Sequence, residues 1–334
     1  MEINKLDIIL KKEPGYRLKQ AKKAIFEQMI EDWNELSVFP LSLREKLNRE
    51  FPLAIKAKFF ETRDKKTVKA VIDLKDGLKI ESVLMRHKDR RNTVCVSCQA
   101  GCALGCQFCA TSKIGFKRNL NFGEILEQVL LFNRYLKKEA KRVTNIVFMG
   151  MGEPFLNYEE VLKSVKLFNN KDFFNIGARH ISISTAGIVE GIKRLSEEKI
   201  QINLAVSLHA SNNNLRSKIM PINKKYPIEK ILKAVDEYIE KTKRKVMFEY
   251  LLIQDLNDSE SDALELAKLM KKPLYFLNLI LYNKTGNFKP SSSERVDRFK
   301  KILKKEKINF VQRYRFGQGL KAACGQLIFK EINN

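Results

Sequence analysis

The sequence lacks a long apolar run, and it has few acidic residues for its number of basic ones. In 334 residues no apolar segment approaches the length that spans a bilayer. The N-terminal residues also show no apolar stretch followed by a cleavage site. These absences predict a cytoplasmic protein with no membrane association. The 39 acidic residues stand against 63 basic ones, which gives a net charge of +24.

This excess of positive charge predicts a polyanionic partner, and nucleic acid is the simplest one. A compositional preference for lysine, or solvated lysines on helix faces, would produce the same total. The basic clusters are scattered along the chain, which fits contact with a large folded RNA better than a short basic tail. They lie at residues 86–91, 137–142, 241–245 and 300–307.

Cysteine is scarce and concentrated, because five of the six cysteines fall within CVSCQAGCALGCQFC, residues 95–109. Clustered cysteines in a cytoplasmic protein typically bind metal or carry out redox chemistry. Cys102, Cys106 and Cys109 have the spacing C-x3-C-x2-C. Three thiolates on one short loop can bind three irons of a [4Fe–4S] cluster and leave the fourth iron open to a cofactor or substrate.

A zinc site is the competing interpretation of the same segment. Its ligands would be the pairs Cys95/Cys98 and Cys106/Cys109, in a C-x2-C…C-x2-C arrangement. Only seven residues separate the two pairs, which is short for such a site. The first pair would also lie in a predicted strand, so the spacing favours the iron–sulfur cluster.

The chain divides into an accessory region, residues 1–90, and a larger region, residues 91–334. The accessory region shows helical patterns and then short strands bounded by turn residues. Its predicted helices cover residues 17–33 and 42–51, and its predicted strands cover residues 67–74 and 78–84. These elements predict a small α+β accessory domain, and we expect this domain to bind RNA.

From residue 93 onward, short apolar strands alternate with amphipathic helices, which predicts an α/β fold with right-handed parallel connections. Strands are predicted at residues 93–97, 145–150, 180–185, 202–208, 245–252, 274–282 and 309–315. Helices are predicted at residues 122–136, 158–168, 227–241 and 261–270. A doubly wound sheet and a (βα) barrel both fit this pattern. The barrel is favoured, because distinctive polar residues follow the strand ends, where a barrel builds its active site.

Two motifs resemble those of radical S-adenosylmethionine enzymes: C-x3-C-x2-C with Phe108 before the last cysteine, and GMGEP at residues 150–154, which is similar to the GGE motif. Longer segments together are similar to the bacterial adenine-C2 methyltransferases of 23S rRNA and tRNA. These segments are residues 95–120, 148–161, 204–229 and 322–327. The resemblance extends over almost the whole chain and implies a partial (βα)6-type radical SAM barrel.

The resemblance also implies the cofactors and partners. A [4Fe–4S] cluster would be bound by Cys102, Cys106 and Cys109, and two S-adenosylmethionine molecules would be used per turnover. The substrates would be 23S rRNA and tRNA, an electron donor such as flavodoxin or ferredoxin would reduce the cluster, and the enzyme would be a monomer. Radical chemistry suits this reaction, since C2 of adenine is too electron-poor to attack a methyl group.

In the scheme that the resemblance implies, Cys324 is methylated first, as a thiolate nucleophile. A 5′-deoxyadenosyl radical then takes hydrogen from the S-methyl group, and the resulting methylene radical adds to C2. Glu81 matches the general base that removes the C2 proton, although by itself it would be interpreted as an exposed strand carboxylate. Cys95 then attacks the sulfur of Cys324, which forms a transient disulfide and releases the product.

The remaining motif residues match cofactor contacts of the family: Gly152, Glu153, Ser184, Ser207, Leu208, His209 and Asn283. His87 and His180 match nothing and receive no role. Cys98 stands where the family usually has serine, and no role follows for this thiol.

Two other functions compete with C2 methylation. A sister family methylates C8 of the same adenine and confers antibiotic resistance, but it usually has alanine where this chain has Pro154. A non-enzymatic, zinc-containing RNA-binding protein is the other alternative. Pro154 and the spacing of the cysteines favour the C2 methyltransferase.

Overall fold

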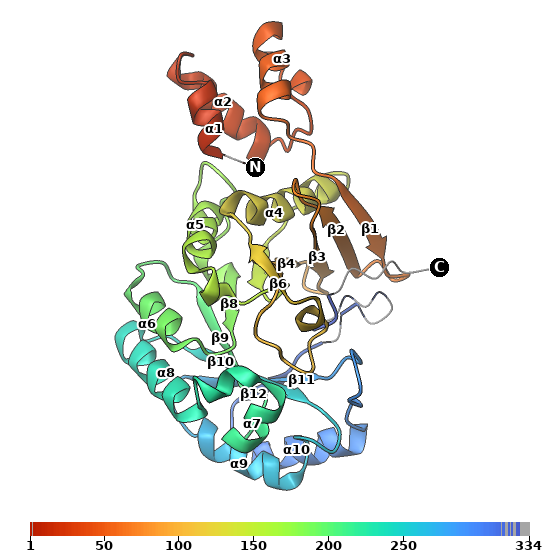
Figure 1. Cartoon of the computed structure of the whole chain (residues 1–334), viewed down its shortest axis with the longest axis vertical. Helices are drawn as coiled ribbons and strands as arrows, with labels where there is room; N and C mark the ends of the chain where they lie inside the picture. Colours follow the sequence, from red (N-terminus) through yellow and green to blue (C-terminus); the bar gives the residue numbers. More distant parts are fainter. Residues whose placement is uncertain (2, 315, 318–319, 321, 323–324, 328–334) are drawn as a thin grey trace.

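A single large sheet runs through most of the chain (Figure 1). The computed structural model describes residues 1, 3–314, 316–317, 320, 322 and 325–327, and within these residues the sheet has ten strands. Their order in the sheet is β1 (Ala57–Glu61), β2 (Thr67–Asp73), β3 (Lys79–Arg86), β4 (Asn92–Cys95), β7 (Asn145–Phe148), β8 (Ile181–Thr185), β9 (Asn203–Ser207), β10 (Val246–Leu252), β11 (Tyr275–Leu281) and β12 (Phe310–Gln312).

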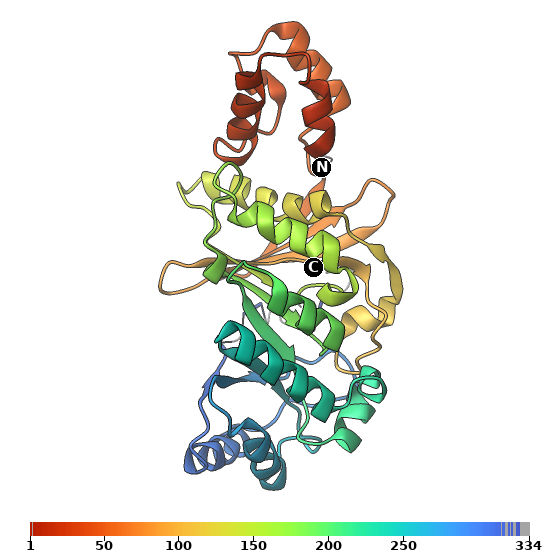
Figure 2. The ribbon, with the colours of Figure 1, turned by 90° about the vertical axis from the view of Figure 1, so that its left-hand side faces the viewer.

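Strands β4, β7, β8, β9, β10, β11 and β12 of this sheet pair with one another in parallel, as predicted for the α/β region. Among the described strands β12 pairs only with β11, which leaves the barrel open. The helices between the strands cover its outer face (Figure 2). They are α4 (Phe122–Lys137), α5 (Tyr158–Asn169), α6 (Val189–Glu197), α7 (Asn213–Ile219), α8 (Ile228–Thr242), α9 (Glu260–Met270) and α10 (Ser293–Lys305).

Local sequence signals explain where these helices begin and which face they bury. Asn121 and Glu124 form a capping box at the start of α4, so each accepts a backbone N–H of the first turn. On α8 the buried residues Ile231, Val235 and Tyr238 recur at a spacing of three or four, which makes one apolar stripe. None of the described helices combines the length and the apolarity needed to cross a membrane.

The first predicted helix is shorter than the sequence pattern indicates. Helix α2 (Gly15–Phe26) ends seven residues before the predicted end at residue 33. Met29 adopts a left-handed backbone with φ of 58°, which a continuing helix cannot accommodate. Trp33 begins a separate 3-10 turn, and its buried ring donates from Nε1 to the carbonyl of Phe51 at 2.8 Å. Burial of this indole overrides the helical periodicity.

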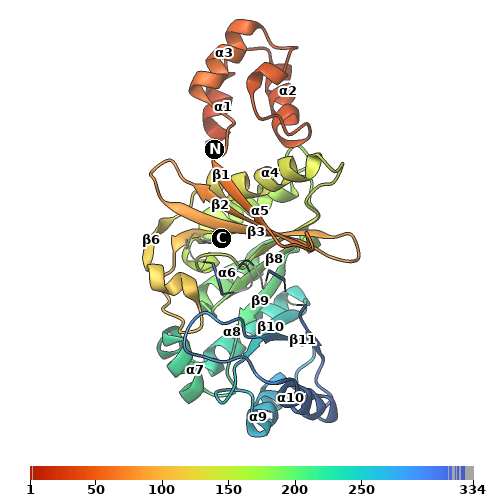
Figure 3. The ribbon, with the colours of Figure 1, turned by 90° about the vertical axis from the view of Figure 1, so that its right-hand side faces the viewer.

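The accessory region consists of two structurally different parts (Figure 3). Helices α1 (Ile3–Ile9), α2 and α3 (Leu41–Glu50) pack at one end of the molecule. The buried Arg134 of α4 anchors them, because its guanidinium donates to the carbonyls of Leu53, at 2.8 Å, and Ile30.

The second part, β1 to β3, is an antiparallel extension of the barrel sheet. Strand β3 pairs with β4, and Val83 lies opposite Cys95. The predicted boundary at residue 90 therefore falls in the turn between two paired strands. The division into domains at that point stays a prediction.

A small hairpin that the sequence pattern did not predict brackets the cysteine loop. Strand β5 (Gln99–Gly101) pairs with β6 (Phe116–Asn119) on either side of it. The backbones approach closely, since a Cβ at Gly101 would lie 1.7 Å from the carbonyl oxygen of Gly115. Gly101 also has a φ of +80°, so only glycine fits there.

Candidate active site

The three cysteines of the C-x3-C-x2-C motif line one cavity of about 140 Å³. They lie on the loop between β5 and β6, above the carboxyl ends of β7, β8 and β9. Polar groups that end or follow these strands line the same cavity, as expected for the active-site end of a barrel. Five of the predicted cofactor contacts are among them, namely Gly152, Glu153, Ser184, Ser207 and His209.

The chemistry of this loop fits an iron–sulfur cluster. Burial raises the pKa of Cys102 to about 11, and it raises the pKa of Cys106 still further. The neighbouring thiols raise both values, because two thiolates side by side repel each other. A cationic iron at each sulfur would reverse this preference, since thiolate is the form that binds metal.

A zinc site is not supported by the described residues. Within them no three side chains of His, Cys, Asp or Glu converge on one ion. A [4Fe–4S] cluster needs thiolates that lie further apart than the ligands of one ion, because each thiolate binds a different iron. Cys98, one of the proposed zinc ligands, is buried in the hydrophobic core, and its Sγ lies 3.7 Å from the carbonyl oxygen of Met151. Burial raises the pKa of Cys98 well above its usual value, which makes it an inert apolar residue.

The GMGEP loop is packed so closely against the cysteine segment that its glycines cannot be replaced. A Cβ at Gly150 would lie 2.6 Å from the carbonyl oxygen of Val96. A Cβ at Gly152, where φ is +100°, would lie 2.5 Å from the side chain of Gln99. Gln99 in turn accepts the backbone N–H of Glu153 at 2.9 Å. The loop therefore presents its backbone to the cavity in one conformation.

Glu153 is a buried carboxylate with two backbone partners. Its Oε2 accepts from the N–H of Ala186 at 2.7 Å, and its Oε1 accepts from that of Phe155 at 3.1 Å. Burial raises the pKa of Glu153 to about 6, and these hydrogen bonds oppose the rise. The carboxylate thus joins the ends of β7 and β8 and supplies negative charge at the cavity wall, where it could bind a cationic amino group.

His209 is held in one orientation by contacts on every side. Its backbone has a φ of 56°, its Nδ1 accepts from the N–H of Leu251 at 3.1 Å, and its ring packs edge-on against Phe108. Because Nδ1 is an acceptor, the ring proton sits on Nε2. Burial, with a smaller contribution from Arg216, lowers the pKa of His209 to about 3. The ring is therefore a neutral hydrogen-bond donor at the cavity wall.

Arg216 was not predicted from the sequence, although it organises the strand ends. Its buried guanidinium donates to the carbonyls of Ala186 at 2.6 Å, Ser207 at 3.1 Å and Leu208 at 3.1 Å. Further bonds reach Asn223 and Tyr226. Burial lowers the pKa of Arg216 to about 10, which still leaves it charged at neutral pH. Leu208 itself is fully buried behind the cavity wall.

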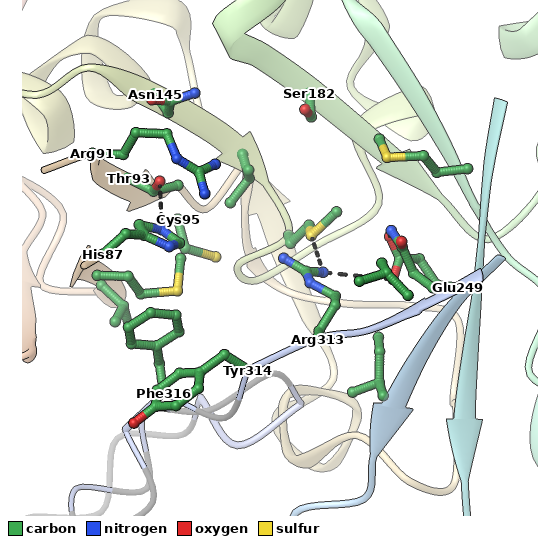
Figure 4. A pocket seen from close by; sticks show the side chains of 18 of the residues that line it. His87, Arg91, Thr93, Cys95, Asn145, Ser182, Glu249, Arg313, Tyr314 and Phe316 are labelled. Atoms are coloured by element: carbon green, nitrogen blue, oxygen red, sulfur yellow. Dashed lines mark hydrogen bonds and ion pairs between the residues drawn. The ribbon is translucent and has the colours of Figure 1, made fainter. Parts of the chain in front are cut away.

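A second cavity of about 520 Å³ adjoins the first and extends into the barrel (Figure 4). Cys95 and Asn283 line it. Glu249 and Arg313 line both cavities, and an ion pair of 3.5 Å joins them at the boundary. Asn278 donates to the buried Glu249 at 2.9 Å. The barrel thus contains two connected spaces, one beside the cluster loop and one beside Cys95.

Glu81 lies on β3, two residues from Val83 and therefore on the same face of the sheet. Val83 lies opposite Cys95 and lines the larger cavity with it. The carboxylate of Glu81 is completely buried and accepts from Nζ of Lys69 at 2.8 Å, and Lys69 is itself only 2% exposed. The interpretation of Glu81 as an exposed strand carboxylate is therefore wrong.

The segment after Cys324 is docked on the cluster loop. The N–H of Ala110 donates to the carbonyl of Gly325 at 2.7 Å, and the hydroxyl of Thr111 donates to that of Leu327 at 2.9 Å. Gly325 and Leu327 also line the cluster cavity. Cys324 itself lies outside the described residues, but its neighbour Gly325 bonds directly to the loop that carries Cys109.

Comparisons with known proteins agree with this geometry. The model of the radical SAM superfamily matches residues 96–267. A probable dual-specificity RNA methyltransferase RlmN of Dictyoglomus thermophilum is 46% identical over 317 residues, which cover 94% of this chain and 91% of the relative. The corresponding protein of Spiroplasma citri is 43% identical and covers 96% and 93%. A crystal structure of a radical SAM methyltransferase from Sphaerobacter thermophilus superposes with a TM-score of 0.93 at 42% identity, covering 98% and 97%.

The chain belongs to the RlmN family of radical SAM RNA methyltransferases.

As an RlmN-family enzyme, the chain uses a [4Fe–4S] cluster and S-adenosylmethionine and acts on RNA. The family also explains why the cysteine loop, the GMGEP loop and the strand ends meet at one cavity. Residues far apart in the sequence, such as Cys109 and Leu327, meet there because the barrel strands end side by side.

Several groups in the larger cavity of this RlmN-family chain carried no signal in the sequence. His87, which bonds to Thr93 at 2.9 Å, and His180, which bonds to Asn145 at 3.2 Å, both line it. Arg91 lines it too and belongs to the basic cluster at residues 86–91. That cluster was the one available signal, but a run of charges does not indicate which side chain faces a cavity.

Proposed function

We propose that this chain methylates C2 of an adenine in 23S rRNA and in tRNA. The observation that carries the proposal is the hydrogen bond from Ala110 to Gly325, because it joins the cluster loop to the segment that follows Cys324. A methyl carrier at Cys324 needs this proximity to the cofactor. The printed name of the relatives, dual-specificity RNA methyltransferase, supports two RNA substrates.

When bound, the cluster and S-adenosylmethionine supply a radical that can take hydrogen from an S-methyl group. The chain's own residues bind and orient the reactants. Glu153, Ser184, Ser207 and the neutral His209 line the small cavity and bind the cofactor, and the close packing of the GMGEP loop excludes water from it. Asn283, on the wall of the larger cavity, is the remaining predicted contact.

The larger cavity holds the target adenine in this proposal. Its volume of about 520 Å³ and its position beside Cys95 support this role, and the base must leave its stack to enter it. Glu81 accepts the proton from C2 at its carboxylate, with Lys69 alongside. The thiolate of Cys95 then attacks the sulfur of Cys324, so that a disulfide bond forms as the bond from this sulfur to the transferred carbon breaks. The freed carbon takes a proton and becomes the methyl group of the released base.

The neighbourhood of Pro154 favours methylation of C2 over C8. Pro154 is buried and begins the 3-10 turn η3 (Pro154–Leu156) directly after Glu153. The C8-methylating sister family usually has alanine at this position. Proline preorganises the first position of a turn and so fixes the entry of the loop that carries Glu153.

The proposal also includes an electron donor and an RNA-binding role for the accessory region. Once Cys95 and Cys324 are assigned to methyl transfer, only Cys98 remains beside the three cysteines of the motif. One thiol is too few for a second cluster, which supports reduction by a separate donor such as flavodoxin or ferredoxin. RNA binding by the accessory region finds support in residues 51–90, where eleven basic residues stand against six acidic ones. The monomeric state and the cytoplasmic location stay predictions.

The decisive experiment is mass spectrometry of digested RNA. Transcribed 23S rRNA and tRNA, incubated with the reconstituted enzyme, reductant and S-adenosylmethionine, should yield 2-methyladenosine. A product that coelutes with 8-methyladenosine would move the enzyme to the sister family. Zinc without iron in the anaerobically purified protein would contradict the proposal that the chain is a radical methyltransferase.

Two cysteine variants test the roles of the distant thiols. Cys324→Ala should abolish methylation and leave the visible absorbance of the cluster intact, because the methyl carrier is lost and the cluster ligands remain. Cys95→Ala should accumulate a covalent protein–RNA adduct, since no thiolate can release it. Cys98→Ser is the matched control and should methylate normally. Free methylated RNA at normal rates from Cys95→Ala would remove Cys95 from the mechanism.

A further inference from the structure

A third cavity, of about 470 Å³, lies outside the active site, between the antiparallel extension and the hairpin that carries the cluster loop. We call it the extension groove. One wall is formed by β1, β2 and β3, and the other by β5, β6 and the residues next to them. Its floor is apolar and includes Phe60, Val71 and Leu78, while Lys58, Lys79 and Lys117 lie at its margins.

The charge of the extension groove is of one sign. None of the ten described residues that line it is acidic. Lys79 pairs with Asp73 at 2.5 Å. Lys58 and Lys117 are exposed, and no carboxylate among the described residues lies within ion-pair distance of either ammonium group. Two uncompensated cations beside an aromatic floor are complementary to a nucleotide, which has a flat base and an anionic phosphate.

The aromatic side chain is fixed before any ligand arrives. Phe60 is half-buried, and the ammonium of Lys69 lies 5.7 Å from the centre of its ring, within the range of a cation–π contact. Lys69 is itself held by Glu81 at 2.8 Å. The ring at the groove is therefore connected to the proposed catalytic carboxylate through one buried lysine.

The register of the strands relates the groove to the active site. Phe60 lies opposite Lys69, Lys69 opposite Val83, and Val83 opposite Cys95. Directly opposed residues of antiparallel strands point to the same face of the sheet. Phe60 and Cys95 thus face the same side, three strands apart, which is about 14 Å at the usual strand spacing.

A second row leads to the proposed base. Lys58 lies opposite Val71, and Val71 lies opposite Glu81. Two strand spacings amount to about 10 Å. The groove is therefore a near neighbour of the place where the adenine would react, on the same face of the sheet.

From this arrangement we propose that the extension groove binds a single-stranded nucleotide of the RNA that flanks the target adenine. The base stacks on Phe60, and its phosphates contact Lys58 and Lys117. An unstacked strand is required, because the target adenine must leave its helix to react and its neighbours then lose a stacking partner. The inference rests on the proposed function and specifies where the substrate is bound outside the barrel.

Steady-state methylation of transcribed 23S rRNA tests the proposal. The double variant Lys58→Ala/Lys117→Ala should raise KM about tenfold with kcat within about twofold. Its plot of log affinity against log salt should be flatter by about 1.4, which is the slope expected for two lost contacts to a single strand. Phe60→Leu keeps the floor apolar and removes the stacking surface, so binding should weaken about fivefold.

The matched control is Lys230→Ala/Lys233→Ala on α8, where two lysines are equally exposed and lie far from the groove. It should match wild type in KM and salt dependence. Unchanged KM and salt slope in the groove variants, with an active wild type, would overturn the proposal. Groove variants that bind RNA normally, but whose cluster is reduced more slowly by flavodoxin, would also overturn the proposal. The groove would then be a docking site for an acidic protein. A wild-type enzyme that methylates no RNA would instead contradict the proposed function.

Discussion

The ion pair between Lys69 and Glu81 places two charges where almost no water reaches them. Both side chains are at most 2% exposed, and their charged atoms are 2.8 Å apart. Removing one partner from such a pair leaves the other charge buried and uncompensated. The pair therefore makes the proposed base one of the most substitution-sensitive positions of the sheet.

Lys69→Met should lower the free energy of unfolding by about 3–5 kcal/mol, because Glu81 would remain charged and without its partner. The double variant Lys69→Met/Glu81→Leu should recover most of that loss. Urea unfolding under anaerobic conditions measures both. The control is Lys272→Met, which breaks the exposed pair with Asp236 and should cost less than about 1 kcal/mol. A double variant that is less stable than Lys69→Met would contradict this account.

The buried ring of His209 predicts a dependence of stability on pH. Its pKa is about 3 when folded and about 6.5 when unfolded. A lowered pKa means that the stability contribution is complete above pH 6.5 and is lost as the pH falls towards 3. Between pH 7 and pH 5 this one residue should cost about 2 kcal/mol of unfolding free energy.

His209→Asn provides the comparison for this prediction. Asparagine tolerates the left-handed backbone of this position and carries an acceptor but no titratable group. Urea unfolding midpoints at pH 7 and pH 5 should differ less for the variant than for wild type. Equal differences in the two proteins would show that His209 titrates normally.

At the scale of single residues, motifs predicted which side chains line the small cavity better than they predicted the residues that support it. The cysteines, Glu153 and His209 were predictable, since each sits in a recognisable pattern. Arg216 and Lys69 were not, because a charged residue between apolar ones is usually solvated. Only the tertiary structure brings the carbonyls of Ala186 and Ser207 around the guanidinium of Arg216.

At the scale of elements, one guanidinium fixes the ends of two barrel strands. Arg216, on α7, bonds to the carbonyls that follow β8 and end β9. Its planar fork reaches several acceptors at once, which a lysine cannot do. The edge of the barrel that lines the small cavity therefore depends on a helix that carries none of the predicted cofactor contacts.

Arg216→Lys should destabilise the protein by at least about 2 kcal/mol, because buried carbonyls lose charge-assisted hydrogen bonds. It should also weaken binding of S-adenosylmethionine, which equilibrium dialysis with the reconstituted enzyme measures. Arg244→Lys is the control, since Arg244 is half-buried and its guanidinium donates to a single carbonyl, that of Gln201. Normal stability and normal cofactor affinity in Arg216→Lys would refute the organising role of this residue.

The regular elements of the barrel were predictable, and the irregular ones were not. Strand β9 and helix α8 lie within one residue of their predicted bounds, because apolar periodicity and a flanking proline define them. The hairpin of β5 and β6 has no apolar alternation, and it forms because Gly101 lets two backbones approach. Helix α2 ends early, since burial of Trp33 requires a turn that the periodicity does not show.

At the scale of the whole molecule, the three N-terminal helices carry almost none of the net positive charge. Residues 1–50, which contain α1, α2 and α3, include ten basic and nine acidic residues. Nearly all of the net charge of +24 therefore lies beyond residue 50. The antiparallel extension belongs to the sheet of the barrel, whereas the N-terminal helical region contacts the barrel region through Arg134 of α4 and through Phe173 and Phe174.

Deletion of residues 1–50 should leave the cluster absorbance intact and change the salt dependence of RNA binding little, because few of the net positive charges are lost. Deletion of residues 1–90 should give aggregated protein, since β4 would become an exposed edge strand. Filter binding of 23S rRNA between 50 and 200 mM salt and size-exclusion chromatography measure these outcomes. A soluble, cluster-bearing protein that lacks residues 1–90 would contradict the continuity of the sheet.

The docking of Gly325 and Leu327 on the cluster loop has a consequence for biogenesis. These residues are synthesised well after the loop from Cys102 to Cys109. Before they have been made, nothing from residues 325–327 can cover the thiols. The order of synthesis thus leaves the nascent chain a period in which iron and sulfide can reach the thiols without displacing residues 325–327.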